Sequence, residues 1–447
     1  MKLPDIKNLS FTEFPATDSH TWKAQILKDI RVATAEERQA VYEDKMRWQS
    51  YEGITIEPFY TKEDLQKLPA VNKPILQESW QNRQYIQVIN EKEANGKALE
   101  AMAAGADALL LDISTDTTVI NLFQLLQNIK LSATPVSFRL QHFPVDFLAQ
   151  LQQIAPYQWK GGLYYDPLTQ YTSRIDTDPG TLFEPLAQAI NVTKDYSHFR
   201  ALTVGSHHFH EAGASAVQEL AFLLNTFVEY AHRLTDMGVA IEDVFSSTEL
   251  SLSVSTSYFV EIAKLRALQF LWQQLANAYQ VQPVPAYIHT RTAQWNKLAA
   301  DAYNNMIRAT IEAMAASLGG AASISVLPYN HDVDDTFAIR IARNVSVILK
   351  EESYLDKVLD VASGSYYIEH LTHSLAAEAW QLFQSIEARG GYLQALQAGL
   401  ISEQIANVRK LKEADLQSGK QVLVGVNKYA PSNSILAEPG FSGFKDW

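Results

Sequence analysis

The feature that most constrains the fold is an alternation of short β-type runs with longer helical runs, which begins at Tyr85 and continues to about residue 350. Apolar residues at every second position favour strands, whereas apolar residues three and four apart favour helices. The runs predicted to be strands are 85–89, 108–113, 136–140, 163–165, 201–204, 250–255, 286–290 and 323–327. Eight such units over about 250 residues are typical of a (β/α)8 TIM barrel, so we expect this α/β fold.

The segments on either side of the repeat have a different pattern. Residues 1–78 combine short amphipathic stretches with a turn-rich run, and they have little apolar core of their own. We expect them to form an extended N-terminal arm that lies on the main domain or contacts another subunit. The barrel is expected over residues 79–350, and residues 351–447 are expected to form a C-terminal extension of helices with an irregular tail.

Several predicted strands carry small hydroxyl residues where barrel axes usually carry branched apolar side chains. Residues 250–255 alternate leucine or valine with serine, 323–326 read SISV, and Thr203 lies in the fifth run. If the apolar residues face the helices, the hydroxyl side chains face the axis and are too small to fill it. We therefore expect a hollow, hydrophilic bore able to hold a long thin polar ligand or a file of water. A shifted register, with the serines at strand ends, is the alternative.

Charge and cysteine content exclude several classes of function. The formal net charge is -13 at pH 7, which argues against nucleic acid and anionic membrane surfaces because both need a contiguous basic footprint. The 447 residues include no cysteine, which excludes disulfides, thiolate nucleophiles and Cys-based metal sites. The sequence shows neither an apolar signal core at its start nor about twenty consecutive apolar residues. A cytoplasmic protein is the simplest interpretation.

The leading candidate site lies where the fifth predicted strand changes into a long helix. Residues 201–215 read ALTVGSHHFHEAGAS, and the change of period falls on His207, His208 and His210. Ligands bind at the carboxyl ends of strands in α/β folds. A metal site is one interpretation because imidazole suits zinc or iron, although a tetrahedral site needs further ligands. A hydrogen-bonded polar cluster at the barrel mouth and a vestigial ligand contact are the alternatives.

Several longer motifs together resemble one known family. They are YEGITIEPFYT (51–61), HFHEAGASAVQELAF (208–222), YFVEIAKLRA (258–267), DAYNNMIRATIEAMAAS (301–317), FAIRIARN (337–344) and DVASGSYYIEHLT (360–372). In this order and spacing they resemble the N-terminal arm and barrel domain of methylmalonyl-CoA mutase. The resemblance implies a barrel lined by small polar residues, with the pantetheine arm of an acyl-CoA threaded through it. It also implies a radical interconversion of methylmalonyl-CoA and succinyl-CoA, with adenosylcobalamin held over the barrel by a separate C-terminal domain.

Two residues match catalytic positions of that family. His208 matches a histidine near the migrating acyl group, and Tyr85 matches the active-site tyrosine of an Arg-Gln-Tyr motif, which here is 83–85. The family tyrosine that precedes this histidine is replaced by a second histidine, and a His-Ser-Gln motif reads His-Thr-Arg at 289–291. The residues at changed family positions, which we treat as candidate substrate-binding residues, are His207, His289, Arg291 and Ser325.

Further departures remove groups that the family's catalysis needs. The run 164–174 supplies no matched arginine for the substrate carboxylate, and a second family arginine, near the cobalamin, falls at about Ser247. The nearest sequence to the family's Asp-x-His-x-x-Gly cobalt-ligand motif is DSH at 18–20, with Lys23 in place of glycine. We interpret it as a chance match. Neither a metal nor a cofactor is therefore expected to bind this chain itself.

This combination resembles the small (beta) subunit of heterodimeric methylmalonyl-CoA mutases, a barrel homologue that supports a catalytic large subunit. The resemblance implies an isolated chain that is inactive, within an isomerase whose adenosylcobalamin lies in the large subunit. An acyl-CoA mutase subunit that binds substrate and uses a cobalamin domain on a separate chain is the alternative. A metal-dependent hydrolase on the same barrel is a third hypothesis, which requires metal at the histidine cluster.

Overall fold

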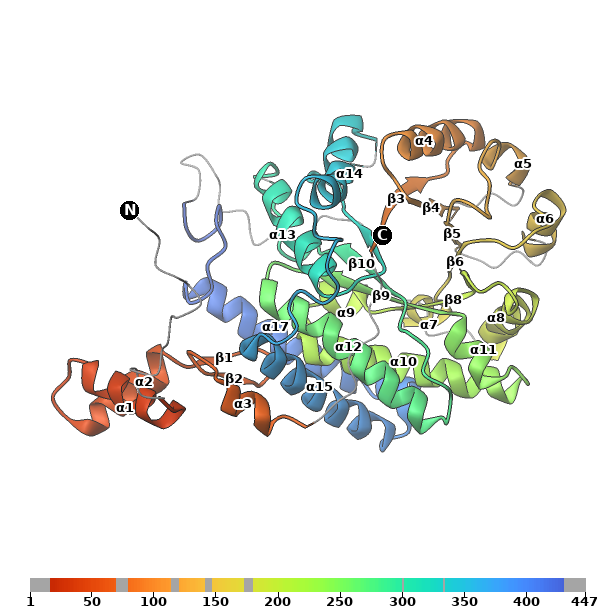
Figure 1. Ribbon diagram of the computed structural model, residues 1–447. Coiled ribbons are helices and arrows are strands. Elements are labelled where there is room, and N and C mark those ends of the chain that lie inside the picture. The colour runs from red at the N-terminus through yellow and green to blue at the C-terminus, as the bar shows by residue number, and fades with distance from the viewer. Residues whose placement is uncertain are drawn as a thin grey trace, which may run out of the picture.

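The computed structural model of the chain describes residues 17–69, 79–113, 120–140, 147–172, 180–299, 301–332 and 334–429. A ring of strands surrounded by helices makes up most of the molecule (Figure 1). Helices α1 (Ser19–Asp29) and α2 (Ala35–Lys45) stand to one side of this ring. Within the described ranges, no helix has the length and apolar character needed to cross a membrane.

The ring is a parallel β-barrel. Its strand segments, within the described residues, are β3 (Gln81–Gln87), β4 (Ala108–Asp112), β5 (Val136–Arg139), β6 (Gly161–Tyr164), β7 (Phe199–Arg200), β8 (Leu202–Gly205), β9 (Thr248–Val254), β10 (Ile288–Thr292) and β11 (Ser323–Ser325). They are hydrogen-bonded in the order β7-β6-β5-β4-β3-β11-β10-β9-β8. Only Ala201 separates β7 from β8, so the two ends of this order belong to one interrupted strand and the ring closes. The predicted (β/α)8 barrel is confirmed, and each predicted strand overlaps an observed one.

The alternation of side chains along the strands separates an apolar outer face from a polar inner face. Phe138 of β5 packs on Phe147 of the surrounding helix α6, with ring centroids 5.2 Å apart. The alternate strand positions that include Phe138 therefore face the helices. Leu250 and Leu252 of β9 belong to the same apolar core. Ser251 and Ser253, which alternate with these leucines, face the axis. Both contact the ring of His207, which follows the neighbouring strand β8. The hydroxyl lining expected from the sequence is therefore present.

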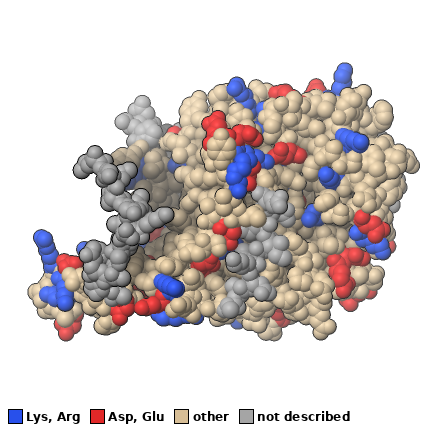
Figure 2. Space-filling view, in the orientation of Figure 1, with Lys and Arg blue, Asp and Glu red and all other residues tan. Residues whose placement is uncertain are grey.

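Helices cover the outside of the barrel. Their bounds are α4 (Glu91–Ala103), α5 (Leu122–Leu125), α6 (Phe147–Ile154), α7 (Pro167–Thr172), α8 (Gly180–Thr193), α9 (His207–Glu211), α10 (Ala216–Asp236), α11 (Ile241–Ser246), α12 (Tyr258–Ala278), α13 (Asn304–Leu318) and α14 (Thr336–Glu351). On the face shown in Figure 2, acidic and basic side chains are interspersed over these helices.

A tight turn and a capping box set the start of α10, the helix that follows the histidine cluster. Gly213 has φ +104°, and a Cβ atom there would lie 2.9 Å from Cβ of Arg409, so the turn between α9 and α10 requires glycine. Ser215 then accepts a hydrogen bond from the backbone N–H of Gln218, whose side chain accepts from the backbone N–H of Ser215. This reciprocal pair fixes where the helix begins.

The remaining elements lie outside the barrel. The arm contains α1, α2, a short hairpin of β1 (Trp48–Gln49) and β2 (Thr55–Ile56), and α3 (Lys62–Lys67), while the C-terminal part contains α15 (Tyr366–Glu387), α16 (Gly391–Gln397) and α17 (Leu400–Gln417). The Tyr51 hydroxyl donates a hydrogen bond of 2.9 Å to Asp415 of α17, which ties the arm to the C-terminal helices. The domain boundaries after residues 78 and 350 stay predictions.

Candidate functional site

At the amino-terminal end of the strands, an ion pair crosses the bore. Arg83 of β3 donates from both terminal nitrogens to Glu249 of β9, at 2.8 and 2.7 Å. Two other strands separate β3 from β9 in the ring, so the pair spans the interior rather than a strand edge. Beside it, the guanidinium of Arg200 lies 3.8 Å from the ring centroid of Tyr287, whose hydroxyl donates to Gln81 at 3.0 Å. This end of the bore is occupied by the chain's own side chains.

One level higher, aromatic rings from opposite strands meet. Tyr164 of β6 and His289 of β10 contact edge to face, with centroids 6.3 Å apart. The Tyr164 hydroxyl lies 3.1 Å from Oγ of Ser251, and Nδ1 of His289 lies 3.1 Å from Oγ of Ser323. Burial, with the charges of Arg83 and Arg291, holds the pKa of His289 well below its usual value, so this ring is neutral.

The bore is therefore polar, as the sequence predicted, but it is not hollow at these two levels. Serine leaves space at the axis, and long side chains from other strands fill that space. The pattern of one strand reveals which residues face inward. It does not reveal which inward side chains from other strands extend far enough to meet across the axis.

Tyr85 lies at the carboxyl-terminal mouth of the bore. Its hydroxyl donates a short hydrogen bond of 2.6 Å to Asp112 of β4, and Arg139 of β5 approaches the same carboxylate oxygen at 3.4 Å. Burial and the neighbouring Asp112 charge raise the pKa of Tyr85 well above its usual value. The Tyr85 hydroxyl is thus protonated, and it already donates its hydrogen bond to a carboxylate of the chain.

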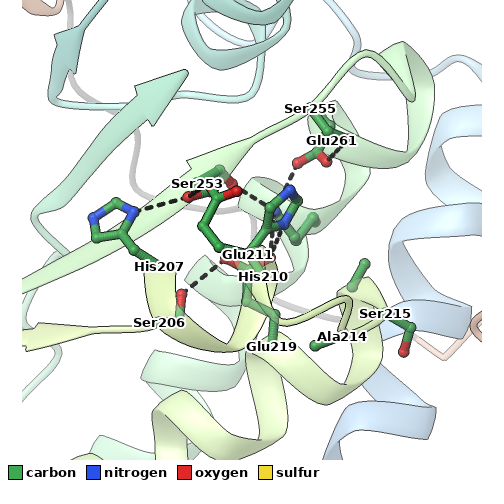
Figure 3. A network of polar contacts seen from close by, with 12 residues as sticks. Ser206, His207, His210, Glu211, Ala214, Ser215, Glu219, Ser253, Ser255 and Glu261 are labelled. Atoms are coloured by element: carbon green, nitrogen blue, oxygen red, sulfur yellow. Dashed lines mark hydrogen bonds and ion pairs between the residues drawn. The ribbon is translucent and has the colours of Figure 1, made fainter. Parts of the chain in front are cut away.

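The three histidines of the cluster point to different partners. The ring of His207 bridges Ser251 and Ser253 at 2.7 and 2.9 Å, inside the bore. His208 lies instead against Phe209, with ring centroids 3.8 Å apart, and burial lowers its pKa to about 4. Figure 3 shows the ring of His210 apart from that of His207. This divergence argues against the metal interpretation, and no set of three or more suitable ligands gathers within the described ranges.

Beneath the cluster lies a network of buried charges (Figure 3). Glu219 of α10 accepts hydrogen bonds from Oγ of Ser206 at 2.9 Å and from Nζ of Lys264 at 2.7 Å, and it lies 3.3 Å from Nδ1 of His210. Lys264 of α12 also pairs with Glu261 at 2.7 Å. Burial alone would raise the pKa of Glu219, but the charges of Lys264 and His210 hold it at about 2.

The sequence reasoning missed this network. A signal for it is present in the sequence, because α10 and α12 each carry at least one charged residue on the buried face. Fully buried charges are rare unless they are paired, so a glutamate and a lysine on two buried helix faces predict each other.

The other candidate substrate-binding residues, Ser325 and Arg291, differ in the hydrogen bonds that they form. The Ser325 hydroxyl donates to the backbone carbonyl of Arg83 at 2.8 Å, so it supports the strand pairing. Arg291 shares the register level of Ser253 and Ser325, and its Nε has no hydrogen-bond partner among the described residues. Of the predicted site residues, His207 and His289 thus lie within one polar network, whereas Tyr85 belongs to a separate contact with Asp112.

The DSH sequence near the N-terminus does not fit a cobalt-ligand motif. Asp18 is the N-cap of α1, and its side chain accepts a hydrogen bond of 2.6 Å from the backbone N–H of Thr21. His20, in the first turn of the same arm helix, is exposed. The motif is a helix start, as its serine and aspartate suggest.

The fold and its interior define the class: a (β/α)8 barrel with a polar bore, an N-terminal arm and added C-terminal helices. The model of the methylmalonyl-CoA mutase family matches residues 117–439. The methylmalonyl-CoA mutase small subunit of Porphyromonas gingivalis is 32% identical over 452 residues, covering 95% of this chain and 71% of that protein. The small subunit of Streptomyces virginiae is 31% identical over 455 residues, covering 96% and 73%. The methylmalonyl-CoA mutase large subunit of Streptomyces virginiae is 25% identical over 487 residues, covering 96% and 64%.

The chain belongs to the methylmalonyl-CoA mutase family, as its motifs predicted. The Porphyromonas gingivalis and Streptomyces virginiae small subunits are both more than 30% identical to the chain, which is therefore a small-subunit homologue within that family.

Proposed function

We propose that this chain is the non-catalytic subunit of an adenosylcobalamin-dependent methylmalonyl-CoA mutase, which interconverts methylmalonyl-CoA and succinyl-CoA. A catalytic large subunit carries the cofactor and the reacting substrate, and this chain supports it in a cytoplasmic heterodimer. The small-subunit relatives support the assignment, as does the existence of a separate large subunit in Streptomyces virginiae.

The observation that carries the proposal is the buried bridge between Arg83 and Glu249 across the bore. A pantetheine arm needs a continuous passage, and this bidentate pair occupies the axis with side chains only 2% and 4% exposed. Breaking a buried ion pair costs about 3–5 kcal/mol when one charge is left uncompensated. Threading an acyl-CoA would have to offset a cost of that size, whereas a subunit that binds no substrate never has to break the pair.

The family-matched positions fit a supporting role. Tyr85 is held by Asp112, and His208 is a neutral ring packed on Phe209. We propose that both are vestigial, together with the former substrate-binding positions His207, His289, Arg291 and Ser325. In this proposal the arm contributes the contact with the large subunit.

The test is co-expression with the large subunit from the same organism, followed by assays of the separated chains and the complex. We expect a one-to-one complex that turns over methylmalonyl-CoA with adenosylcobalamin, and no turnover by this chain with the cofactor alone. Calorimetry of the isolated chain with succinyl-CoA should show no binding. Turnover by the isolated chain would overturn the proposal. Tight acyl-CoA binding without turnover would instead favour a substrate-binding subunit that uses a cobalamin domain on another chain.

A further inference from the structure

A pocket lies outside the bore, where the arm, the barrel and the C-terminal helices meet. It has a cavity volume of about 120 Å³. Tyr51 and Glu52 line it from the arm, Lys412 from α17, and His210 and Trp295 from the barrel. The former acyl-CoA positions Tyr85, His208 and Arg291 are not in its lining, so the pocket is distinct from the family's substrate passage.

His210 lies in the wall of this pocket and has one ring nitrogen without a partner among the described residues. The residue is only 7% exposed, and its Nδ1 lies 3.3 Å from the ionised carboxylate of Glu219. A carboxylate accepts and does not donate, so Nδ1 is the donor in this contact and Nε2 is the other ring nitrogen. Nε2 has no hydrogen-bond partner among the described residues. A buried polar atom without a partner is destabilising, and a polar group of a ligand would recover that loss.

Lys412 presents a positive charge to the same pocket. Its ammonium donates to the backbone carbonyl of Ala214 at 2.8 Å and lies 5.8 and 5.6 Å from the ring centroids of Tyr51 and Trp295. No carboxylate of the described residues forms an ion pair with it. Burial lowers the pKa of Lys412, which shows that the charge is poorly solvated. An ammonium in such surroundings favours an anionic partner.

Among the described acidic groups around the pocket, Glu52 is the one that forms no direct ion pair with a cation. Glu219 and Glu261 pair with Lys264, and Glu413 pairs with Arg409. Glu52 accepts a long hydrogen bond of 3.4 Å from the backbone N–H of Ala216 at the start of α10 and forms no ion pair among the described residues. Its charge nevertheless acts on Lys412, where it opposes the effect of burial on the pKa. The pocket therefore carries one carboxylate and one ammonium that are not joined in a direct ion pair. The rest of its wall includes apolar side chains, which are Val260, Leu416, Val422 and Leu423.

We propose that this pocket binds a zwitterionic α-amino acid with an apolar side chain. The ligand carboxylate meets the Lys412 ammonium, the ligand ammonium meets the Glu52 carboxylate, and the ligand side chain packs against Val260 and Leu416. Because the ligand would touch both the arm and α17, its binding would hold the arm against the body of the molecule. The proposal does not depend on the mutase role.

Calorimetry of the full chain with matched small molecules tests the charge pattern without altering the protein. L-leucine is the probe, 4-methylpentanoate lacks its ammonium, 3-methylbutylamine lacks its carboxylate, and glycine lacks its side chain. We expect L-leucine to bind at least about tenfold more tightly than each of the others, since each loses one of the three contacts. No binding of L-leucine up to about 10 mM, or equal binding of 4-methylpentanoate, would overturn the proposal.

Variants then place the binding at this pocket. Lys412→Met keeps the length of the side chain but removes its charge, and Glu52→Gln removes the carboxylate charge that meets the ligand ammonium. Each should weaken L-leucine binding by about tenfold or more. Lys410→Met, on the exposed side of the same helix, is the matched control and should leave the affinity unchanged. Unchanged affinity in Lys412→Met would place the ligand elsewhere and refute the site. If that variant does not fold, the ligand series on the natural chain decides alone.

Discussion

The two ends of the barrel bore use charge differently. At the amino-terminal end, Arg83 meets Glu249 in a bidentate pair that is almost completely buried. At the carboxyl-terminal mouth, Arg139 reaches Asp112 at 3.4 Å with a quarter of its side chain exposed, and Nε of Arg291 has no hydrogen-bond partner among the described residues. In barrels of this class the amino-terminal face serves stability and the carboxyl-terminal face serves function.

The difference shows that polar residues in a bore do not by themselves define a binding site. A buried charge that is paired with another charge of the chain has a structural role, and removing its partner should lower the free energy of unfolding. A charge at the mouth that lacks a firm partner contributes little to stability. Measurements of stability at the two ends can therefore test the contrast directly.

The largest expected effect is at the amino-terminal end. Arg83→Met should lower the free energy of unfolding by about 3–5 kcal/mol, because it leaves Glu249 as an uncompensated buried charge. Urea unfolding of the purified chain, followed by circular dichroism, measures this change.

Two controls make the first prediction sharper. The double variant Arg83→Met/Glu249→Leu removes both charges and should recover most of the loss, since an apolar pair of similar volume replaces a buried ion pair at little cost. Arg233→Met breaks a pair with Glu229 on the surface of α10, where the arginine side chain is 48% exposed, and should cost less than about 1 kcal/mol. If Arg83→Met costs no more than Arg233→Met, the contrast between the two ends fails.

The second prediction concerns acid and the neutral histidines near the mouth. Burial lowers the pKa of His208 from 6.5 to about 4, and it holds the pKa of His207 well below 6.5. Below pH 6.5 the unfolded chain therefore binds protons that the folded chain does not, so stability is full above pH 6.5 and falls towards pH 4. The His208 shift corresponds to a loss of at most about 3 kcal/mol.

Urea unfolding at pH 7, 6 and 5 measures the slope in a window above the titration of ordinary carboxylates. His208→Gln should flatten the slope because glutamine binds no proton, whereas His20→Gln, in the exposed part of the arm, should leave it unchanged. An equal slope in His208→Gln and the natural chain would show that this ring is not held neutral in the fold.

The sequence predicted the barrel because each strand carries its own signal. The alternation of leucine and serine in β9 was enough to place the serines on the axis. The bridge from Arg83 to Glu249 joins residues 166 positions apart, and its existence depends on the ring order of the strands. No pattern within one element contains that information.

The histidine cluster was predicted as one site, but the structure divides it. Histidines two apart at a strand end would project in the same direction, whereas His207 begins the short helix α9. Successive residues of a helix rotate by about 100°, so the rings diverge into the bore, towards Phe209 and towards Glu219. The pocket beside His210 was not predicted, because its walls come from segments that lie far apart in the chain.

The smallest expected effect is at the mouth. Arg139→Gln should lower the free energy of unfolding by less than about 1 kcal/mol, because its contact with Asp112 is long and its side chain is 26% exposed. Salt provides a second criterion. In about 1 M NaCl the Arg139→Gln effect should shrink towards zero, since screening acts on solvated charges, while the Arg83→Met effect should persist. A large, salt-independent loss in Arg139→Gln would mean that the mouth is as firmly built as the opposite end. The distinction between a structural end and a ligand-facing end would then no longer hold.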